Sequence, residues 1–396
     1  MHEHFRVLYS FPHKLGADRI CTTAWYQVHG LIQAGADVVV FPGALSRPLL
    51  HEATVRPTLA KGRLRIPYRA LGSMRAFALH DYIVARRLER LRGKIDIVHT
   101  WPLGALRTLQ TAARLGIATV LERPNAHTRF AYEVVRKECE RLALTLPANH
   151  EHAYNEQVLA KEEAEYQLAT RLLCPSDFVA RTFLELGFPE EKLARHQYGF
   201  DERVYYPSHD RARDKTGLTM LFVGGCAPRK GLHYALEAWV GSTASREGEF
   251  LIAGAFVPGY AEKLATMLSH PSVQVLGHRT DVPELMRKSD ILVLPTAEEG
   301  SALVTSEARG SGCVLLVSEA AGAICQHMEN ALVHRVGDVA ALTDHIKLLD
   351  ANRPLLQELR AASLRTVPEI TWTAAAQHLL RAYREAVVSH ADRAPV

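Results

Sequence analysis

Residues 290–319 contain two short apolar runs on either side of a loop and a helix-forming segment. The first run, at 291–294, ends at Pro295, and the second, at 314–317, follows Gly310 and Gly312. Short apolar runs bounded by Pro or Gly are typical of strands buried in a sheet. Because two such strands joined through a helix run parallel, the stretch predicts a β-α-β unit with its helix beginning near Ser301.

The same alternation of apolar runs and amphipathic segments continues along most of the chain. A chain of 396 residues is too long for one ordinary core, which suggests roughly two to three domains. Two similar α/β domains fit best, joined by the polar segment 208–217. The predicted strands are 6–9, 36–41, 95–99, 118–121 and 171–174 in the first half, and 220–223, 249–253 and 273–276 in the second.

Composition favours a folded protein that stays in the cytoplasm. Hydrophobic residues make up 47% and charged residues 23% of the chain, and no apolar run is long enough to span a membrane. The first apolar run has the length of a strand and ends at Pro12, unlike a signal peptide. A net charge of +4 gives little support to nucleic-acid binding. The six cysteines lack metal-ligand spacing, so we expect reduced thiols and no metal site.

Glycines follow two of the predicted strands. Gly16 after the first strand lets a ligand approach the backbone, although a plain turn is the alternative. Gly225 follows the strand at 220–223, and Arg229 and Lys230 open the next helix. A glycine loop followed by two cations at a helix start is typical of phosphate binding, with a solvated basic pair as the alternative. The spacing matches neither GxxxxGK[ST] nor GxGxxG, which disfavours an ATPase or a simple dehydrogenase.

Two carboxylates lie in the stretch 290–319. We expect Glu299 in the loop and Glu307 in the helix, so that one carboxylate faces each end of a bound ligand. Backbone N–H groups at a helix start favour a phosphate. The N–H groups predicted to point out of this helix are those of Gly300, Ser301, Ala302 and Leu303.

A polar loop, 122–128, follows the strand predicted at 118–121. Open α/β sheets place ligands at the carboxyl ends of their strands. The chain has 20 histidines, so an arbitrary one is structural or exposed in most cases. The position of His127 in this loop favours a general acid/base or hydrogen-bonding role.

Residues 73–94 form a predicted amphipathic helix rich in arginine and lysine. Two interpretations stay open for its basic face. It is either a solvated surface or a patch that contacts anionic lipid, which would place the protein peripherally at the inner face of the membrane.

With these features placed, the chain resembles the family 4 glycosyltransferases, which have the GT-B fold of two facing Rossmann-like domains. The resemblance covers nearly the whole length. Its motifs are KLGADRI after the first strand, VGGCAPRKG after the linker, and two glutamates with seven residues between them, Glu299 and Glu307. It implies an acceptor-binding domain at 1–208, a donor-binding domain at 209–371, and a last helix within 372–396 that crosses back to the first domain.

The resemblance also implies a role for each candidate residue. Lys230 would contact the donor diphosphate, Glu307 the nucleotide ribose, and Glu299 the transferred sugar. His127 would face the reacting sugar, with Asn125 beside it on the acceptor side. The implied catalytic residues are therefore His127, Lys230 and Glu299, and the other implied donor contacts are Gly16, Gly225, Arg229, His278, Arg279, Gly300, Ser301, Ala302, Leu303 and Glu307.

The implied activity is retaining transfer of a sugar from a nucleotide-diphosphate sugar, most readily a UDP- or GDP-sugar, to an acceptor hydroxyl. The acceptor would be a sugar, a glycan, a lipid-linked glycan or a small molecule. A lysine and helix-end N–H groups can stabilise the departing diphosphate. Since no DxD-like motif stands in a plausible place, the resemblance implies no metal and no cofactor beyond the nucleotide sugar.

One position departs from the family pattern. The family commonly has an arginine where Gly225 stands, and Arg229 could replace it from a nearby loop position. Three alternatives stay open. They are a nucleotide-sugar epimerase of similar architecture, a noncatalytic nucleotide-sugar-binding protein, and, more distantly, a nucleic-acid-binding module.

Overall fold

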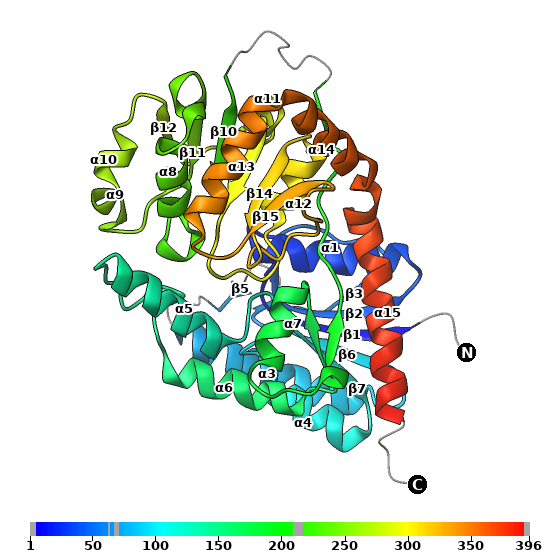
Figure 1. The fold of residues 1–396 in the computed structure, drawn as a ribbon. Coiled ribbons are helices and arrows are strands. Elements are labelled where there is room, and N and C mark those ends of the chain that lie inside the picture. The colour runs from blue at the N-terminus through cyan, green and yellow to red at the C-terminus, as the bar shows by residue number, and fades with distance from the viewer. Residues whose placement is uncertain (1–4, 62–63, 67–70, 209–216, 392–396) are drawn as a thin grey trace. The chain divides into compact units, whose positions relative to one another are not determined.

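The computed structural model describes residues 5–61, 64–66, 71–208 and 217–391. Their packing divides the chain into two compact units (Figure 1). The first unit comprises Met1–Pro124, Asn155–Tyr198 and Trp372–Val396, and the second comprises Asn125–Tyr154 and Gly199–Thr371. The predicted linker lies almost wholly outside the described residues, and the domain boundaries at 208 and 371 stay predictions.

The first unit is built on a seven-stranded sheet in the order β3-β2-β1-β6-β7-β8-β9. Every neighbouring pair in this sheet is parallel. Its strands are β1 (Arg6–Leu15), β2 (Asp37–Leu45), β3 (Thr54–Val55), β6 (Ile97–Thr100), β7 (Ala118–Glu122), β8 (Arg171–Cys174) and β9 (Leu193–Arg195), and a separate antiparallel pair is formed by β4 (Ala60–Lys61) and β5 (Leu64–Arg65). Its helices are α1 (Ile20–Gln33), α3 (Ser73–Arg90), α4 (Leu106–Leu115), α6 (Glu156–Leu168), α7 (Asp177–Leu184) and α15 (Trp372–Ala391), with the short η1 (Glu190–Lys192).

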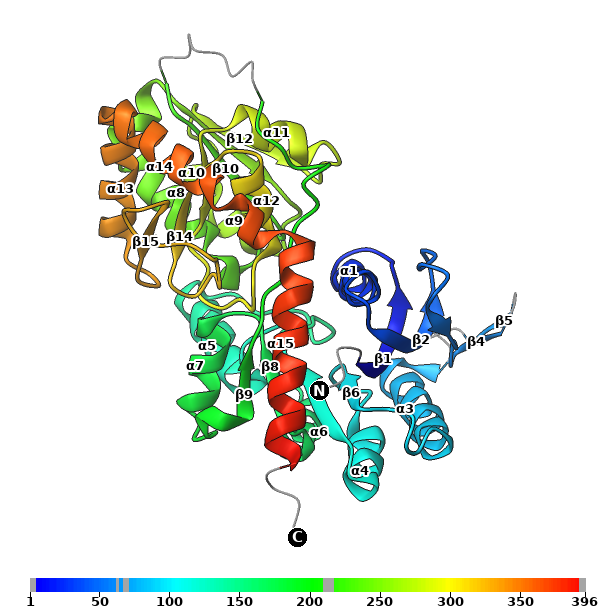
Figure 2. The same cartoon turned by 90° about the vertical axis from the view of Figure 1, so that its right-hand side faces the viewer.

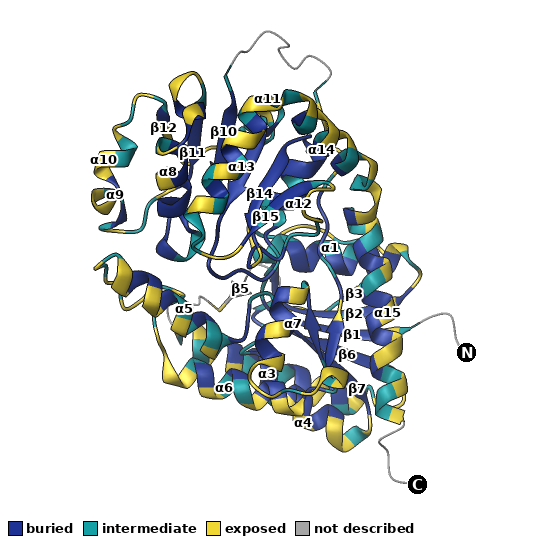
Figure 3. Ribbon diagram, viewed as in Figure 1, coloured by how far each residue is buried: buried dark blue, intermediate teal, exposed yellow. Residues whose placement is uncertain are grey.

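Helices cover both faces of this sheet because the side chains of each strand alternate between the faces. Val7 and Tyr9 of β1 pack with α1 and α15, whereas Leu8 between them packs with α3 and α4. The strands are therefore buried on both sides, as the dark blue arrows in Figure 3 show. This burial explains why they read as continuous apolar runs in the sequence.

The first strand is longer than the sequence predicted. The sequence predicted a strand at 6–9, but β1 continues to Leu15 and pairs with β2 on both sides of an irregularity. Its register shifts between Phe11 and Lys14, a segment that contains Pro12. Proline lacks the N–H needed for regular pairing and is tolerated at such an irregularity. The buried side chains of Phe11 and Leu15 keep the strand in the sheet beyond it.

The C-terminal helix packs on the first unit, as the sequence predicted. α15 contacts α1, β7 and β9 and is drawn in red in Figure 2. The ring of Trp372 stacks on Tyr26 at 4.8 Å between centroids. A Cβ added to Gly30 of α1 would lie 2.8 Å from the Cβ of Ala376, so glycine permits the close approach of the two helices.

The second unit is built on a six-stranded parallel sheet in the order β12-β11-β10-β13-β14-β15. Its strands are β10 (Thr219–Val223), β11 (Glu249–Ala253), β12 (Val273–Gly277), β13 (Ile291–Leu294), β14 (Val314–Ser318) and β15 (Ala331–His334). Its helices are α5 (Thr128–Arg141), α8 (Leu232–Val240), α9 (Tyr260–Lys263), α10 (Ala265–Leu268), α11 (Val282–Lys288), α12 (Leu303–Gly310), α13 (Val339–Ala351) and α14 (Arg353–Arg365), with the short η2 (Pro228–Lys230), η3 (Thr243–Arg246) and η4 (Val367–Ile370).

Both units are thus Rossmann-like, which confirms the predicted fold class. In the second sheet the chain runs outward from β10 in one direction to β11 and β12, and in the other direction from β13 to β15. The connections that follow β10 and β13 therefore run in opposite directions along the sheet, and such a switch point between neighbouring strands is where sheets of this class bind ligands. None of the described helices is both long and apolar enough to cross a lipid bilayer.

Two polar side chains cap helix starts in the first unit. Ser176 accepts the N–H of Val179 and caps α7. Asp81, which the sequence placed on the exposed basic helix, is instead buried. Its carboxylate accepts the N–H groups of Arg107 and Thr108 and so caps the start of α4.

We expect a buried histidine to make stability fall on mild acidification. The two ring nitrogens of His80 lie 2.9 Å from Ser10 Oγ and 2.7 Å from Thr58 Oγ1. Burial, with His13 adding to it, lowers the pKa of His80 to about 3. The unfolded chain then binds a proton near pH 6.5, before the folded one does. The unfolding free energy should fall by up to about 1.4 kcal/mol per pH unit for this group as pH drops below about 6.5.

Urea unfolding at several pH values between 5 and 7.5 measures this slope. His80→Gln keeps a donor and an acceptor but does not titrate, so its slope should be shallower than that of the wild type. Equal slopes in the two proteins would rule out His80 as the source.

Candidate active site

The loops after β10 and β13 are held together at a glycine. Gly231 follows η2 with a φ of 69°, a left-handed conformation that glycine adopts at little cost. A Cβ at this position would lie 2.0 Å from the carbonyl oxygen of Pro295 at the end of β13. The N–H of Ala297 also donates to the carbonyl of Arg229 at 2.7 Å. The geometry of the basic pair therefore depends on the loop after β13.

Gly231→Ala should destabilise the second unit and disturb this pair of loops. The left-handed φ and the clash with Pro295 should together lower the unfolding free energy by about 2–4 kcal/mol. Gly225→Ala is the matched control, because Gly225 is exposed, lacks a left-handed φ and has nothing within 4 Å of an added Cβ. Thermal and urea unfolding compare the two; equal effects would contradict the assigned close approach.

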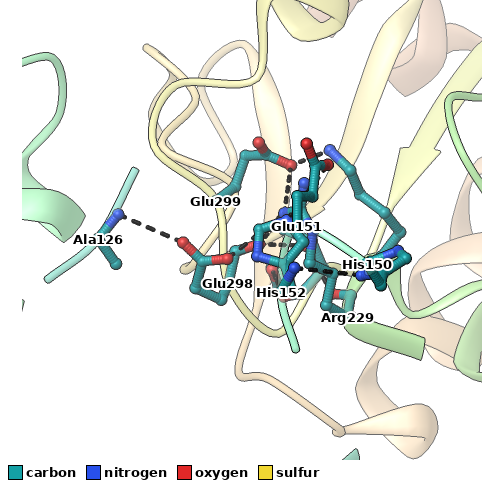
Figure 4. A network of polar contacts seen from close by, with 10 residues as sticks. Ala126, His150, Glu151, His152, Arg229, Glu298 and Glu299 are labelled. Atoms are coloured by element: carbon teal, nitrogen blue, oxygen red, sulfur yellow. Dashed lines mark hydrogen bonds and ion pairs between the residues drawn. The ribbon is translucent and has the colours of Figure 1, made fainter. Parts of the chain in front are cut away.

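Two cations and two carboxylates meet between these loops (Figure 4). Arg229 Nη1 lies 3.4 Å from Glu298 Oε2 and 3.3 Å from Glu299 Oε2. Lys230 forms an ion pair with the same Glu299 oxygen. Burial lowers the pKa of Lys230 well below its usual value and Arg229 adds to this, whereas Glu298 and Glu151 oppose it. Lys230 and Glu299 were both predicted as donor contacts. They are 69 positions apart in the sequence but direct neighbours in the structure.

The sequence interpretation missed Glu298. Its carboxylate is fully buried, and its Oε1 accepts the N–H of Ala126 at 3.3 Å (Figure 4). This contact brings the segment at Ala126 and His127 to the loop after β13. The one sequence signal was the acidic pair Glu298-Glu299 after a buried strand, since two carboxylates there are costly unless both are bound.

His127 caps the helix α5. Its Nδ1 accepts the N–H of Arg129 at 3.2 Å, and its carbonyl accepts the N–H of Ala131 at 2.9 Å. A neutral imidazole whose Nδ1 accepts a hydrogen bond carries its proton on Nε2. The tautomer is inferred from this contact. In this tautomer Nε2 is a hydrogen-bond donor and not a base.

A second segment that the sequence did not single out lies near the basic pair. His150, Glu151 and His152 lie before α6, and Figure 4 shows them beside Arg229. Glu151 Oε1 lies 3.5 Å from His152 Nε2. His152 first, with Arg229 and His150 contributing, lowers the pKa of Glu151 to about 2. Nothing in the local pattern of these residues indicated a neighbour 78 positions later in the chain.

The helix after β13 begins later than predicted. α12 starts at Leu303, so Ser301 and Ala302 are not helical. The N–H of Ala302 donates to the carbonyl of Ala321 at 3.2 Å. The expectation that this N–H points out of the helix toward a phosphate is therefore wrong, because the fold already uses it. The predicted contacts of Gly300, Ser301 and Leu303 stay predictions.

Glu307 lies half-buried on α12, as expected. Burial raises the pKa of its carboxyl to about 7, against a hydrogen bond from Tyr205 that lowers it. Tyr205 comes from the segment that precedes the linker. A carboxyl with this pKa can both donate and accept hydrogen bonds near neutral pH.

The other predicted donor contacts lie on separate loops, and the roles of His278 and Arg279 stay predictions. His278 and Arg279 are exposed after β12, two strands from β10 in the sheet, and Arg279 pairs with Asp281 at its own loop. Gly16 belongs to the first unit and has the expected left-handed φ of 77°. A Cβ added to Gly16 would lie 2.6 Å from the Cβ of Arg47. The group that approaches the backbone of Gly16 closely is therefore Arg47 of the same chain.

The polar loop after β7 is divided between two roles. The sequence placed all of 122–128 at a ligand site, but Glu122 and Arg123 are buried in the first unit. Arg123 lies 3.4 Å from Glu162 and over the ring of Tyr166. Asn125 is half-buried at the start of the segment that belongs to the second unit. The expectation fails for the first two residues because they pair with side chains distant in the sequence.

Two family models match the chain. The model described as Glycosyltransferase Family 4 matches residues 22–203, and the model described as Glycosyl transferases group 1 matches residues 217–352. Curated relatives include the D-inositol 3-phosphate glycosyltransferases of Mycobacterium tuberculosis and Mycobacterium bovis, 26% identical over 238 residues. That match covers 55% of this chain and 49% of the relative, so the chain spans about half the length of the curated relatives it matches.

Solved structures share the fold over nearly the whole chain. Sucrose-phosphate synthase from Thermosynechococcus elongatus has a TM-score of 0.68 at 17% identity and covers 98% of this chain and 100% of its own. HepE from Anabaena, solved in complex with UDP, has a TM-score of 0.66 at 14% identity and covers 95% and 98%. The lipopolysaccharide outer core galactosyltransferase WaaB has a TM-score of 0.67 at 13% identity and covers 95% and 98%.

The two family models together cover most of both units, and the neighbours share their fold. Lys230 lies at the end of η2, Glu299 in the loop after β13 and Glu307 on α12, in the segments where the sequence predicted them. The chain therefore belongs to the family 4 glycosyltransferases.

Proposed function

We propose that the protein transfers a sugar from a nucleotide-diphosphate sugar to an acceptor hydroxyl, with retention of the anomeric configuration. The observation that carries this proposal is the meeting of Lys230 and Glu299 between the carboxyl ends of β10 and β13. This is the place where a doubly wound sheet binds a nucleotide. Family membership supplies the reaction class.

Each charged group has a distinct role in the proposed reaction. Departure of a nucleoside diphosphate builds negative charge on the leaving oxygen, which the Lys230 ammonium stabilises. Lysine has three N–H donors, so it can keep Glu299 and also bind a phosphate oxygen. Glu299 is then held where it can accept hydrogen bonds from the hydroxyl groups of the sugar. Glu307 accepts hydrogen bonds from the hydroxyl groups of the ribose. The Nε2–H of His127 donates to the sugar, and Asn125 lies toward the acceptor.

The donor is proposed to be a UDP- or GDP-sugar. UDP is favoured, because the structural neighbour HepE was solved with UDP and with UDP-glucose. His278 and Arg279 would contact the base, and Gly225 would face the donor. The acceptor is proposed to be a sugar, a glycan or a lipid-linked glycan. No metal or further cofactor is proposed, because Lys230 would supply the positive charge beside the diphosphate.

The direct experiment incubates the protein with a panel of UDP- and GDP-sugars and acceptors and measures release of nucleoside diphosphate. NMR of the product then gives the anomeric configuration. We expect one donor to be consumed in an acceptor-dependent way, with retention. Isomerised donor without an acceptor would identify an epimerase instead, and tight binding without any turnover would identify a noncatalytic binder.

Gly225→Arg tests the position at which the family commonly has an arginine. An added Cβ at Gly225 meets nothing within 4 Å, so the backbone accepts the longer side chain. A second cation facing the diphosphate should tighten donor binding by about tenfold, as expected for one charge-assisted hydrogen bond. Gly225→Gln is the neutral control of similar length. Calorimetry with UDP and GDP measures the change; equal affinity in both variants would place residue 225 away from the diphosphate.

We also propose that α3 contacts an anionic membrane surface at the cytoplasmic face. Its end and the turn after it carry a row of exposed cations, namely Arg86, Arg87, Arg90, Arg92 and Lys94. Each cation near an anionic bilayer contributes about 1 kcal/mol. Sedimentation with phosphatidylglycerol vesicles should bring down the wild type but not Arg87→Glu/Arg90→Glu. Equal binding to vesicles of neutral phosphatidylcholine would refute an electrostatic contact.

A further inference from the structure

We propose that Glu298 and Arg229 are positioning residues that hold the backbone at Ala126 and, through it, the imidazole of His127. The proposal rests on the proposed function, because it assigns the pair a part in sugar transfer. It differs from the role expected for Arg229, which was contact with the donor diphosphate.

The carboxylate of Glu298 joins two segments distant in the sequence. Its Oε1 accepts the N–H of Ala126 at 3.3 Å, and its Oε2 lies 3.4 Å from Arg229 Nη1. Glu298 has no exposed surface. A carboxylate removed from water in this way carries a large desolvation penalty unless it is paired and hydrogen-bonded. Glu298 is therefore stable in this place only as long as both contacts persist.

The guanidinium of Arg229 is held by the loop after β13. Its Nη1 donates to the carbonyl oxygen of Glu298 at 2.9 Å and lies 3.3 Å from Glu299 Oε2. The carbonyl of Arg229 accepts the N–H of Ala297 at 2.7 Å. Arg229 is thus bound to this loop by its side chain and by its backbone. Lys230, the next residue, is the cation that the geometry leaves for a diphosphate.

One peptide unit separates the N–H held by Glu298 from the backbone of His127. Ala126 is fully buried and His127 is 2% exposed, so neither has room to move independently. On the other side, His127 Nδ1 is held by the N–H of Arg129. A displacement of a reacting group by about 1 Å can lower a rate about 100-fold. Loss of the Ala126 contact should therefore lower the rate of the reaction by displacing the imidazole of His127.

The first arm of the test needs no activity. The protein is labelled with 15N at histidine, and the His127 signals are assigned by their loss in His127→Gln. We expect the wild type to show the tautomer with the proton on Nε2. Glu298→Met should shift both nitrogen signals, while Glu284→Gln, which changes an exposed carboxyl on α11, should leave them unchanged. Unchanged His127 signals in Glu298→Met would overturn the proposal.

Glu298→Gln keeps the fold testable if the methionine variant does not fold. The glutamine is isosteric and retains an acceptor for Ala126, but a neutral acceptor binds about half as strongly as a charged one. Its shift of the His127 signals should therefore be in the same direction and smaller. A glutamine variant with signals identical to those of the wild type would count against the proposal.

The second arm separates positioning from donor binding. Glu298→Met should lower kcat about 10- to 100-fold and leave the Kd for UDP or GDP within about twofold. Combined with His127→Ala, it should lower kcat no further than His127→Ala alone, because both changes act on one group. The positioning role would be overturned if the double variant lost kcat by the product of the two single losses. It would also be overturned if Glu298→Met weakened nucleotide binding at unchanged kcat. A wild type that neither binds nucleoside diphosphates nor turns over any donor would overturn the proposed function instead, and the NMR arm would still decide the structural link.

Discussion

Lys230→Met should lower kcat/KM for the nucleotide sugar by about 10²–10³-fold. The methionine side chain keeps the length and apolar stem of lysine but removes the ammonium group that pairs with Glu299. Loss of one group that stabilises a developing charge in a buried site costs a factor of this size. Release of nucleoside diphosphate under single-turnover and steady-state conditions measures the loss.

Lys263→Met is the matched control, because Lys263 is an exposed lysine on α9 in the same unit. Its kinetics should equal those of the wild type. Lys230→Arg, which keeps a cation of different shape, should recover part of the lost rate. Wild-type kinetics in Lys230→Met would show that the diphosphate does not bind at Lys230. The proposed active site would then be wrong.

Glu122→Leu should lower the unfolding free energy by about 3–5 kcal/mol. The carboxylate of Glu122 is fully buried at the end of β7. Its Oε1 lies 2.9 Å from His196 Nε2 and accepts the hydroxyl of Tyr198 at 3.0 Å, and its Oε2 accepts from Gln27 Nε2 at 2.8 Å. Removing one member of such a group leaves the other polar atoms buried without their partner, which carries a cost of about this size.

The ionisation of Glu122 supports the size of this effect. Burial by itself would raise the pKa of its carboxyl, but His196, His99 and Gln27 outweigh burial, and the pKa is lowered from its usual value. The group is therefore a carboxylate at neutral pH, and its donors are bound to a full negative charge. Hydrogen bonds to a charged group are stronger than those between neutral groups.

Urea unfolding of three variants tests this assignment. Tyr198→Phe removes a single donor and should cost about 1–2 kcal/mol. Glu185→Gln alters an exposed carboxyl after α7 and should stay within about 0.5 kcal/mol of the wild type. If Glu122→Leu were no less stable than Glu185→Gln, the buried network would not contribute to the stability of the first unit.

Local pattern was sufficient for some elements of the second unit. The strands β11 and β13 have the predicted bounds, because each is a largely apolar run with a glycine or proline beside it. The segment 260–268 divides into α9 and α10 at Leu264. The side-chain period specifies which residues are buried, but it does not specify where the backbone leaves helical geometry.

The candidate site could be located from sequence only in part. Lys230 and Glu299 were placed in loops after two strands, and parallel strands bring such loops to one edge of a sheet. Glu298 and Glu151 were missed. Their partners are Ala126 and Arg229, far away in the chain, and no periodicity within one segment reports such a neighbour.

The amino-acid sequence by itself determined the alternation of strands and helices, the two parallel sheets, the loops that carry Lys230 and Glu299, and the helix that carries Glu307. These follow from short-range patterns of burial and turn chemistry, which each segment contains. Only the tertiary structure decided that the N–H of Ala302 serves the fold and that Arg229 binds Glu298. The physical reason is that a polar atom finds its partner through packing between distant segments, and a buried charge persists only where that packing supplies one.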